Sequence, residues 1–254
     1  MPVPSSRLLT WQRSPLLAHV VPLLAFMLLS EIASLVKIEN SALPWYRSAP
    51  EHWVYPMQCV IIAGVLWFFR SHYTLRPWRG WPLAVALGIV GIAVWILPSW
   101  LHETLPRDDA KLPAWYEWLG ITARREGFDP TLFSNDSAAY WTTTLLRLAR
   151  MTFIVPLVEE IFWRGFLMRY VQAGERPFLR VPFGQHSWAA FVIVTGAFML
   201  IHQPSDYLGA WVFGSLMYLL AVRTQSLGAC VVMHATANLA LGLYVLRTEQ
   251  WGLW

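Results

Sequence analysis

Seven apolar stretches dominate this sequence. Most are long enough to cross the hydrocarbon core of a membrane, which takes about 20 residues of helix. In lipid only helices or closed barrels satisfy every backbone polar group, and uninterrupted apolar runs of this length indicate helices. The stretches cover residues 16–36, 54–69, 81–98, 140–172, 187–202, 207–222 and 226–246. We therefore expect an all-α fold, a polytopic transmembrane helical bundle of about seven spans, or eight if one span has been missed.

The composition excludes several classes of protein. Hydrophobic residues make up 56% of the chain and charged residues 13%, about half the charged share of a soluble domain. The net charge is +4, but the 19 basic residues are spread between apolar stretches and form no basic run, so we expect no nucleic-acid partner. The two cysteines, Cys59 and Cys230, lie inside apolar stretches and form neither a disulfide framework nor a metal motif.

The basic residues between the stretches predict the orientation, because cytoplasmic loops of membrane proteins are enriched in Lys and Arg. A cytoplasmic N-terminus leaves only Lys37, Arg47 and Arg247 in the short outer segments, while the long segment 99–139 is exempt from this count. The cytoplasmic side then holds Arg7, Arg13, Arg70, Arg76, Arg79, Arg169, Arg176, Arg180 and Arg223. We expect an integral, multi-pass protein of a bacterial inner membrane rather than of the endoplasmic reticulum.

Tryptophans near the ends of the stretches fit this arrangement, since the indole ring favours the headgroup level of a bilayer. They are Trp45, Trp53, Trp78, Trp81, Trp100, Trp141 and Trp188. The only sizeable polar segment, residues 107–136, can form an interfacial helix and loop, and we assign it no chemistry.

Ionisable and amide side chains inside a span are costly and usually face the interior of the protein or a water-filled cavity. They are therefore the first candidates for function. In this chain they are Glu31, Arg147, Arg150, Glu159, Glu160, Arg164, His202, His234 and Asn238.

Glu159 and Glu160 lie side by side in the fourth stretch. Glu160 and Arg164 are four residues apart, so a regular helix would place them on one face as an ion pair. Glu159 is turned about 100° away and has no partner at that spacing. A carboxylate beside a second carboxylate, in poorly hydrated surroundings, is suited to take a proton from water. An ion-pair network that only locks the bundle explains the same residues equally well.

Two further pairs have helical spacing. Phe198 and His202 are four apart, so the phenyl ring can support the imidazole, and His234 and Asn238 are also four apart in an otherwise apolar span. Such side chains need partners or a substrate, because hydrocarbon offers none. Glu159 precedes a loop at about 173–187 by 14 residues and His202 follows it by 15. Antiparallel helices would hold both residues at one height, roughly 21–22 Å from the loop.

Together these three motifs resemble the CAAX-protease and bacteriocin-processing family of intramembrane glutamic endopeptidases. The family pattern, Glu-Glu-x-x-x-Arg, Phe-x-x-x-His and His-x-x-x-Asn on successive spans, stands here in the same order within about 140–246.

The resemblance implies a catalytic core at 140–246. Residues 1–139 contribute N-terminal spans and an extracytoplasmic polar segment by their hydropathy, and no motif of the family lies in them. It implies that Glu159 activates water with help from His202, and that His234 and Asn238 stabilise the oxyanion. Glu160, Arg164 and Phe198 would support them. It implies no cofactor, a protein or peptide substrate that can carry a lipid, and the bilayer as surroundings.

Two alternatives stay open. Glu159, His202 and His234 could together bind zinc in a metalloprotease, although no His-Glu-x-x-His helix is present. The chain could also be a non-catalytic membrane protein that confers bacteriocin immunity or binds a peptide.

Overall fold

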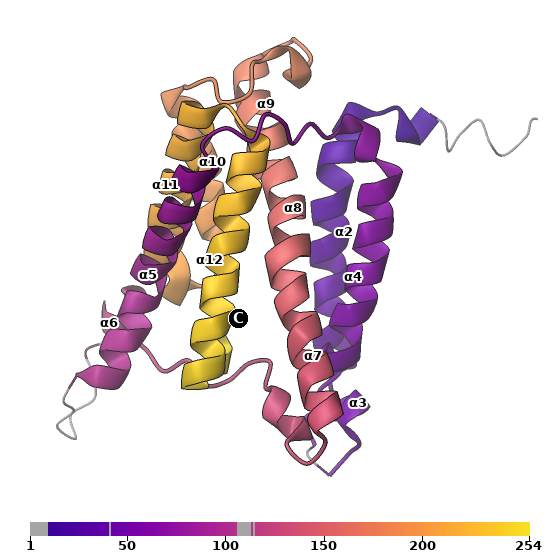
Figure 1. The fold of residues 1–254 in the computed structure, drawn as a ribbon, viewed down its shortest axis with the longest axis vertical. Helices are drawn as coiled ribbons and strands as arrows, with labels where there is room; N and C mark the ends of the chain where they lie inside the picture. Colours follow the sequence, from indigo (N-terminus) through magenta and orange to yellow (C-terminus); the bar gives the residue numbers. More distant parts are fainter. Residues whose placement is uncertain (1–9, 41, 106–112, 114) are drawn as a thin grey trace, which may run out of the picture. The chain divides into compact units, whose positions relative to one another are not determined.

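The structure is a computed structural model that describes residues 10–40, 42–105, 113 and 115–254 (Figure 1). Every described residue in regular secondary structure is helical, which confirms the predicted all-α fold. The α-helices are α2 (Pro15–Val36), α3 (Trp45–Ser48), α4 (Glu51–Phe68), α5 (Trp81–Thr104), α6 (Trp115–Trp118), α7 (Ser137–Ala149), α8 (Val155–Glu160), α9 (Met168–Ala173), α10 (Trp188–Leu200), α11 (Tyr207–Thr224) and α12 (Leu227–Thr248). Short 3₁₀ turns are η1 (Arg70–His72), η2 (Pro130–Phe133), η5 (Phe178–Arg180), η6 (Pro204–Asp206) and η7 (Trp251–Leu253).

Two π-helical segments interrupt the run from α7 to α9. They are η3 (Arg150–Ile154), between α7 and α8, and η4 (Ile161–Leu167), between α8 and α9. The chain is thus helical without a break from residue 137 to residue 173. The π-turns matter for function because hydrogen bonds there join residues five apart, and such turns often occur at functional sites.

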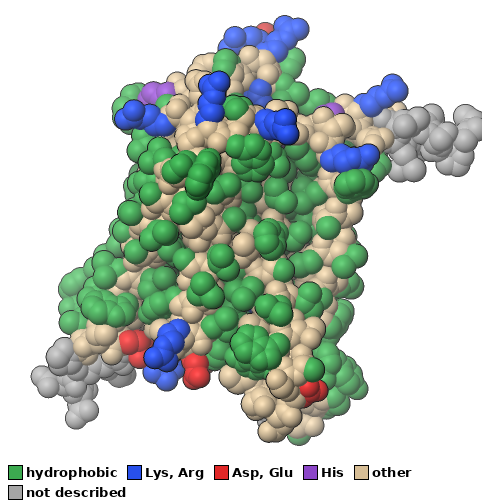
Figure 2. Space-filling view, viewed as in Figure 1, with side chains coloured by type: hydrophobic (Ala, Val, Ile, Leu, Met, Phe, Trp, Pro, Cys, Tyr) green, Lys and Arg blue, Asp and Glu red, His purple; other side chains and the backbone are tan. Residues whose placement is uncertain are grey.

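Each of the seven apolar stretches overlaps one helix or, for 140–172, this helical run. Among the described residues, four helical segments are long and apolar enough to cross a membrane, namely Pro15–Val36, Trp81–Thr104, Pro204–Thr224 and Leu227–Thr248, and α10 is a shorter apolar helix. Figure 2 shows hydrophobic side chains covering the sides of the helices, with charged side chains near their ends. The number of seven spans stays a prediction.

Serine side chains start three of these helices. The hydroxyl oxygens of Ser14, Ser187 and Ser226 each accept a hydrogen bond from a backbone N–H in the first turn of the helix that follows, α2, α10 and α12 respectively. This bond satisfies one of the N–H groups that a helix leaves unpaired at its start. The starts of these apolar helices are therefore fixed by the sequence itself.

One compact unit comprises residues 1–74 and 130–162. Its helices α2 and α4 pack against each other, α8 packs against α2, and α7 and η3 pack against α4. A buried polar network joins three of these elements. The Gln58 side chain on α4 donates to the Phe26 carbonyl oxygen (2.6 Å) and to Ser30 Oγ (2.8 Å) on α2. It accepts a hydrogen bond from Nε of Arg150 on η3 (2.7 Å), whose guanidinium also stacks on the Tyr55 ring.

The other unit comprises residues 75–129 and 163–254. Within it α11 lies between α10 and α12 in the chain and packs on both, α5 packs on α11 and α12, and α9 packs on α10. A Cβ atom at Gly88 on α5 would come within 2.6 Å of the Met233 carbonyl oxygen on α12. Glycine is needed there because only its lack of a side chain lets the two backbones approach so closely.

The two ends of this second unit differ in charge. At the end where α5 begins and α11 ends, the described basic residues are Arg76, Arg79, Arg169, Arg176, Arg180 and Arg223, with Glu175 as an acidic neighbour in the chain. At the opposite end are Arg124, Arg125 and Arg247 together with Glu103, Glu126, Asp129, Asp206 and Glu249. The excess of arginine at one end agrees with the predicted orientation, which stays a prediction, as does the boundary at residue 140 between N-terminal spans and catalytic core.

Parts of two predictions lie outside the described residues. These are Arg7, in the orientation argument, and residues 107–112 and 114, in the polar segment 107–136. The rest of that segment forms the short helix α6, the turn η2 and irregular backbone between them.

Candidate functional site

Phe198 on α10 is the centre of an aromatic cluster in the second unit. Its ring is 1% exposed. The Arg164 guanidinium lies over the ring at 5.4 Å, and the Trp163 ring meets it edge-on at 5.9 Å. The His202 ring is 4.7 Å away. The structure thus brings together three of the residues singled out in the sequence, Arg164, Phe198 and His202.

His202 lies just beyond the end of α10, whereas the predicted stretch continued to residue 202. The helix ends at Leu200 because Pro204 disfavours helical geometry at Gln203, whose ψ is 150°. The expected support from Phe198 survives this difference, since the two rings stay in contact.

The hydrogen bonding of His202 determines which ring nitrogen can act as a base. Nδ1 lies 2.7 Å from the Phe198 carbonyl oxygen. A carbonyl oxygen only accepts, so in the neutral ring Nδ1 carries the proton and Nε2 keeps its lone pair. The imidazole also meets the Trp95 ring of α5 edge-on at 5.2 Å, which fixes its orientation. His202 is therefore held in the tautomer that can accept a proton at Nε2.

His234 and Asn238 both lie in the regular helix α12, four residues apart as predicted. His234 is 5% exposed and Asn238 is half-buried. The His234 ring meets Phe213 of α11 at 5.5 Å, and Phe213 in turn stacks on Phe198 at 6.2 Å. Phe213 thereby connects His234 to the cluster that holds His202.

Glu159 and Glu160 belong to the other unit and end the short helix α8. Glu160 is fully buried. Glu159 is half-buried, and its Oε2 atom is buried with no hydrogen-bond partner among the described residues. A buried carboxylate oxygen without a partner in the protein is an uncommon feature that calls for a functional explanation.

The helix between Glu160 and Arg164 differs from the predicted one. The pairing of these two residues rested on regular α-helical spacing, but η4 begins directly after Glu160 and is π-helical. Arg164, like Glu160, is fully buried. Their ion pair stays a prediction, because a wider turn changes the angle between residues four apart.

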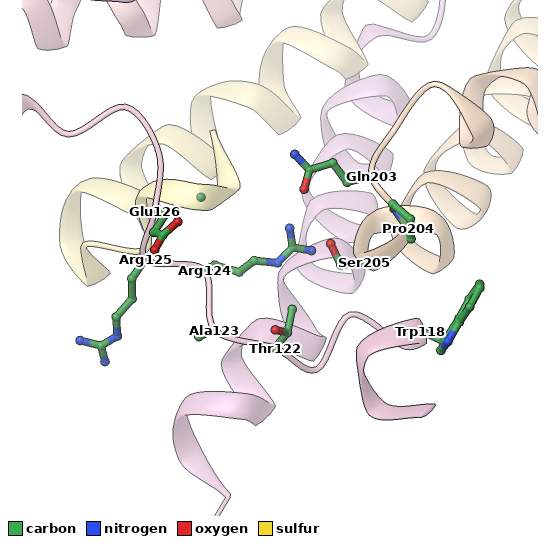
Figure 3. Close-up of a pocket in the computed structure, with 10 residues that line it drawn as sticks. Trp118, Thr122, Ala123, Arg124, Arg125, Glu126, Gln203, Pro204 and Ser205 are labelled. Atoms are coloured by element: carbon green, nitrogen blue, oxygen red, sulfur yellow. The ribbon is translucent and has the colours of Figure 1, made fainter. Parts of the chain in front are cut away.

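A polar pocket opens directly after His202, within the second unit (Figure 3). Its volume is about 810 Å³, and Gln203, Pro204 and Ser205 line one side of it. Arg124, 7% exposed, extends across the pocket toward Ser205 and pairs with Asp206 at 2.6 Å. The pocket therefore borders the segment that directly follows His202 in the chain.

One alternative from the sequence was a zinc site formed by Glu159, His202 and His234. Within residues 10–40, 42–105, 113 and 115–254, no group of three or more His, Cys, Asp or Glu side chains is arranged to hold a metal ion.

The aromatic residues that position the histidines, Trp95 and Phe213, are not among the candidates singled out from the sequence. Trp95 and Phe213 lie in apolar stretches and were read only as parts of spans. The sequence could have indicated them only as aromatic residues in neighbouring helices. Aromatic residues are so common in membrane spans that this feature does not distinguish these two from the others. Gln58 is not among those candidates either, although it is an amide in an apolar stretch and so satisfies the criterion applied to them.

Comparison with known proteins gave one family. Residues 141–240 match the family model described as type II CAAX prenyl endopeptidase, Rce1-like. All seven motif residues, from Glu159 to Asn238, lie inside the matched segment. No curated protein and no solved structure matches the chain.

Proposed function

We propose that this integral membrane protein, whose residues 141–240 match the Rce1-like CAAX protease model, is an intramembrane endopeptidase of the glutamate type. The observation that carries the proposal is the position of the three ordered motifs inside the matched segment. Peptide-bond hydrolysis needs a base for water, donors for the developing oxyanion and a proton for the departing amine.

Glu159 is the proposed base. Its buried Oε2 has no hydrogen-bond partner among the described residues, so no protein donor competes for its lone pairs. Glu159 removes a proton as the water oxygen attacks the carbonyl carbon of the substrate. The proton is then delivered to the amine nitrogen when the C–N bond breaks, so Glu159 ends the cycle ionised again.

His202 is proposed to assist this proton transfer. Its Nδ1 is engaged with the Phe198 carbonyl oxygen, which leaves Nε2 as the acceptor. Contacts with Trp95 and Phe198 restrict the ring, so little reorganisation is needed during the reaction.

His234 and Asn238 are the proposed oxyanion donors. Their spacing on α12 puts both side chains on one face of a regular helix. Donors held in a site poor in water are usually the largest single contribution to such catalysis. Glu160, Arg164 and Phe198 are positioning residues in this proposal, because Arg164 lies over the Phe198 ring that supports His202.

The proposed substrate is a protein or peptide that reaches the enzyme from the membrane, with or without an attached lipid. The pocket beside Gln203 offers room for a polar part of such a chain. The family match names prenyl endopeptidases, so prenylated peptides are the first substrates to test.

The test is cleavage of a mixed peptide library, with prenylated and unmodified C-termini, by the detergent-purified full chain. Wild type, Glu159→Gln and the control Glu31→Gln are compared by mass spectrometry, with and without a chelator. Glu31 is a suitable control because it is an exposed carboxylate within α2, outside the motifs. We expect cleavage by wild type and control, none by Glu159→Gln, and no effect of the chelator. Loss on chelation would favour a zinc protease, and no cleavage by wild type would favour a binding or immunity function.

A further inference from the structure

A second cavity in the unit of residues 75–129 and 163–254 has no role in the proposed chemistry. It has a volume of about 610 Å³ and lies between α5 and α11, at the end where α5 begins. Its walls carry two arginines, Arg79 and Arg223, and three leucines, Leu83, Leu87 and Leu219. The cavity thus combines cations with an apolar wall.

The order of these residues along the helices gives the cavity a direction. Arg79 lies two residues before the start of α5, and Leu83 and Leu87 follow four residues apart on that helix. On α11, which runs the opposite way, Leu219 precedes Arg223 by four residues. Both arginines are therefore at the helix ends and the leucines lie deeper along the helices. This matches a phospholipid, with its phosphate at the arginines and an acyl chain along the leucines.

The two cations are available for an anion. Arg79 and Arg223 are exposed, and neither guanidinium has a hydrogen bond or ion pair with another described residue. None of the described residues that line the cavity is acidic. Phosphate is the anion that a pair of arginines recognises well.

Neighbouring tryptophans place the cavity at headgroup depth. Trp78 is 49% exposed and Trp81 is 57% exposed, one on each side of Arg79 and Gly80 in the chain. Exposed tryptophans at helix ends mark the boundary between hydrocarbon and water. Figure 2 shows Lys and Arg side chains beside hydrophobic ones at the helix ends.

The backbone that carries Arg79 is held against α11. Gly80 has φ +73°, and a Cβ atom there would clash with Cγ2 of Thr224. Only glycine combines this conformation with this approach, so the segment before α5 is fixed beside the end of α11 that bears Arg223.

We propose that this cavity binds the phosphate headgroup of an anionic phospholipid from the surrounding leaflet. Basic pockets between membrane helices are a known means of lipid recognition. The site does not depend on the proposed peptidase activity, because it uses none of the motif residues.

The experiment measures lipid binding to the detergent-purified full chain by native mass spectrometry. Phosphatidylglycerol is compared with phosphatidylcholine of the same acyl chains, so that the contrast is in headgroup charge. The test variant is Arg79→Gln/Arg223→Gln. The matched control, Arg176→Gln/Arg180→Gln, removes two exposed arginines at the same end of the same unit but outside the cavity. A third variant, Arg79→Lys/Arg223→Lys, keeps the charge.

We expect wild type to prefer phosphatidylglycerol. Losing the cavity arginines should weaken its binding by about fivefold for each arginine, while the control and the lysine variant should retain most of it. Equal binding of the two lipids by wild type would overturn the proposal. An equal loss in the control would also overturn it, because the effect would then reflect general surface charge.

Discussion

Gln58 allows the buried network of the first unit to be tested quantitatively. The side chain is 0% exposed and forms three hydrogen bonds, to Phe26, Ser30 and Arg150. Side-chain hydrogen bonds between membrane helices contribute about 0.6 kcal/mol on average and about 1.7 kcal/mol at most. Gln58→Leu, which keeps the volume but removes all three, should therefore lower the free energy of unfolding by about 2–5 kcal/mol. The upper half of that range is expected because Arg150 loses a charge-assisted bond.

A double-variant cycle separates the Gln58–Arg150 interaction from simple repacking. Unfolding is followed by circular dichroism during titration with sodium dodecyl sulfate in mixed micelles. The variants are Gln58→Leu, Arg150→Met and the pair, with Ser215→Ala as a control whose hydroxyl is exposed and bonds only to its own helix. Because an apolar pair leaves no buried charge, the double variant should lose at least about 1 kcal/mol less than the two single losses together. Strict additivity, or a Gln58→Leu loss below about 0.5 kcal/mol, would refute the reasoning.

Three further predictions concern single side chains. Arg164→Ala should lower the melting temperature and the peptidase activity together, since it empties a fully buried position over Phe198; unchanged melting would show that the residue has no structural role. His234→Ala and Asn238→Ala should each reduce kcat by about 10²–10³ with little change in KM, and a change confined to KM would assign them to substrate binding instead. Burial raises the pKa of the Tyr73 phenol, whose OH donates to the Ala18 carbonyl oxygen at 2.6 Å. The resulting stability is present below pH 10 and is lost as the pH rises through the raised pKa, so Tyr73→Phe should unfold with a smaller dependence on pH above 10.

The helices were predictable because their signals are local. Apolar stretches of the right length mark the helices, and serines such as Ser187 and Ser226 at the start of a stretch can cap the helix that follows. The end of α10 had a signal too, since Pro204 follows closely, but the apolar count carried the predicted span on to His202.

The π-turns on either side of α8 could not be predicted. Hydropathy reports which residues avoid water, but not whether a backbone N–H bonds to the carbonyl four or five residues earlier. The helical argument for Glu160 and Arg164 therefore rested on an assumed regular spacing, which η4 does not provide.

Contacts between distant parts of the chain were also beyond the sequence. Gln58 and Arg150 are 92 residues apart, and each alone is only a polar residue in an apolar stretch. The tautomer of His202 depends on a backbone oxygen whose position is known only once the helix end is known. The motifs did indicate which side chains to examine, because intramembrane Glu, His and Asn are rare.

The most direct test of the proposed mechanism is the single-turnover rate of peptide cleavage by wild type and by Glu159→Gln, both in the same detergent and with matched melting temperatures. A general base contributes about 10²–10⁴-fold. The proposal therefore predicts a loss of at least about 100-fold in the variant, which keeps the size of the side chain but cannot take the proton. A rate within tenfold of wild type, in a variant that melts normally, would contradict the assignment of Glu159 as the base.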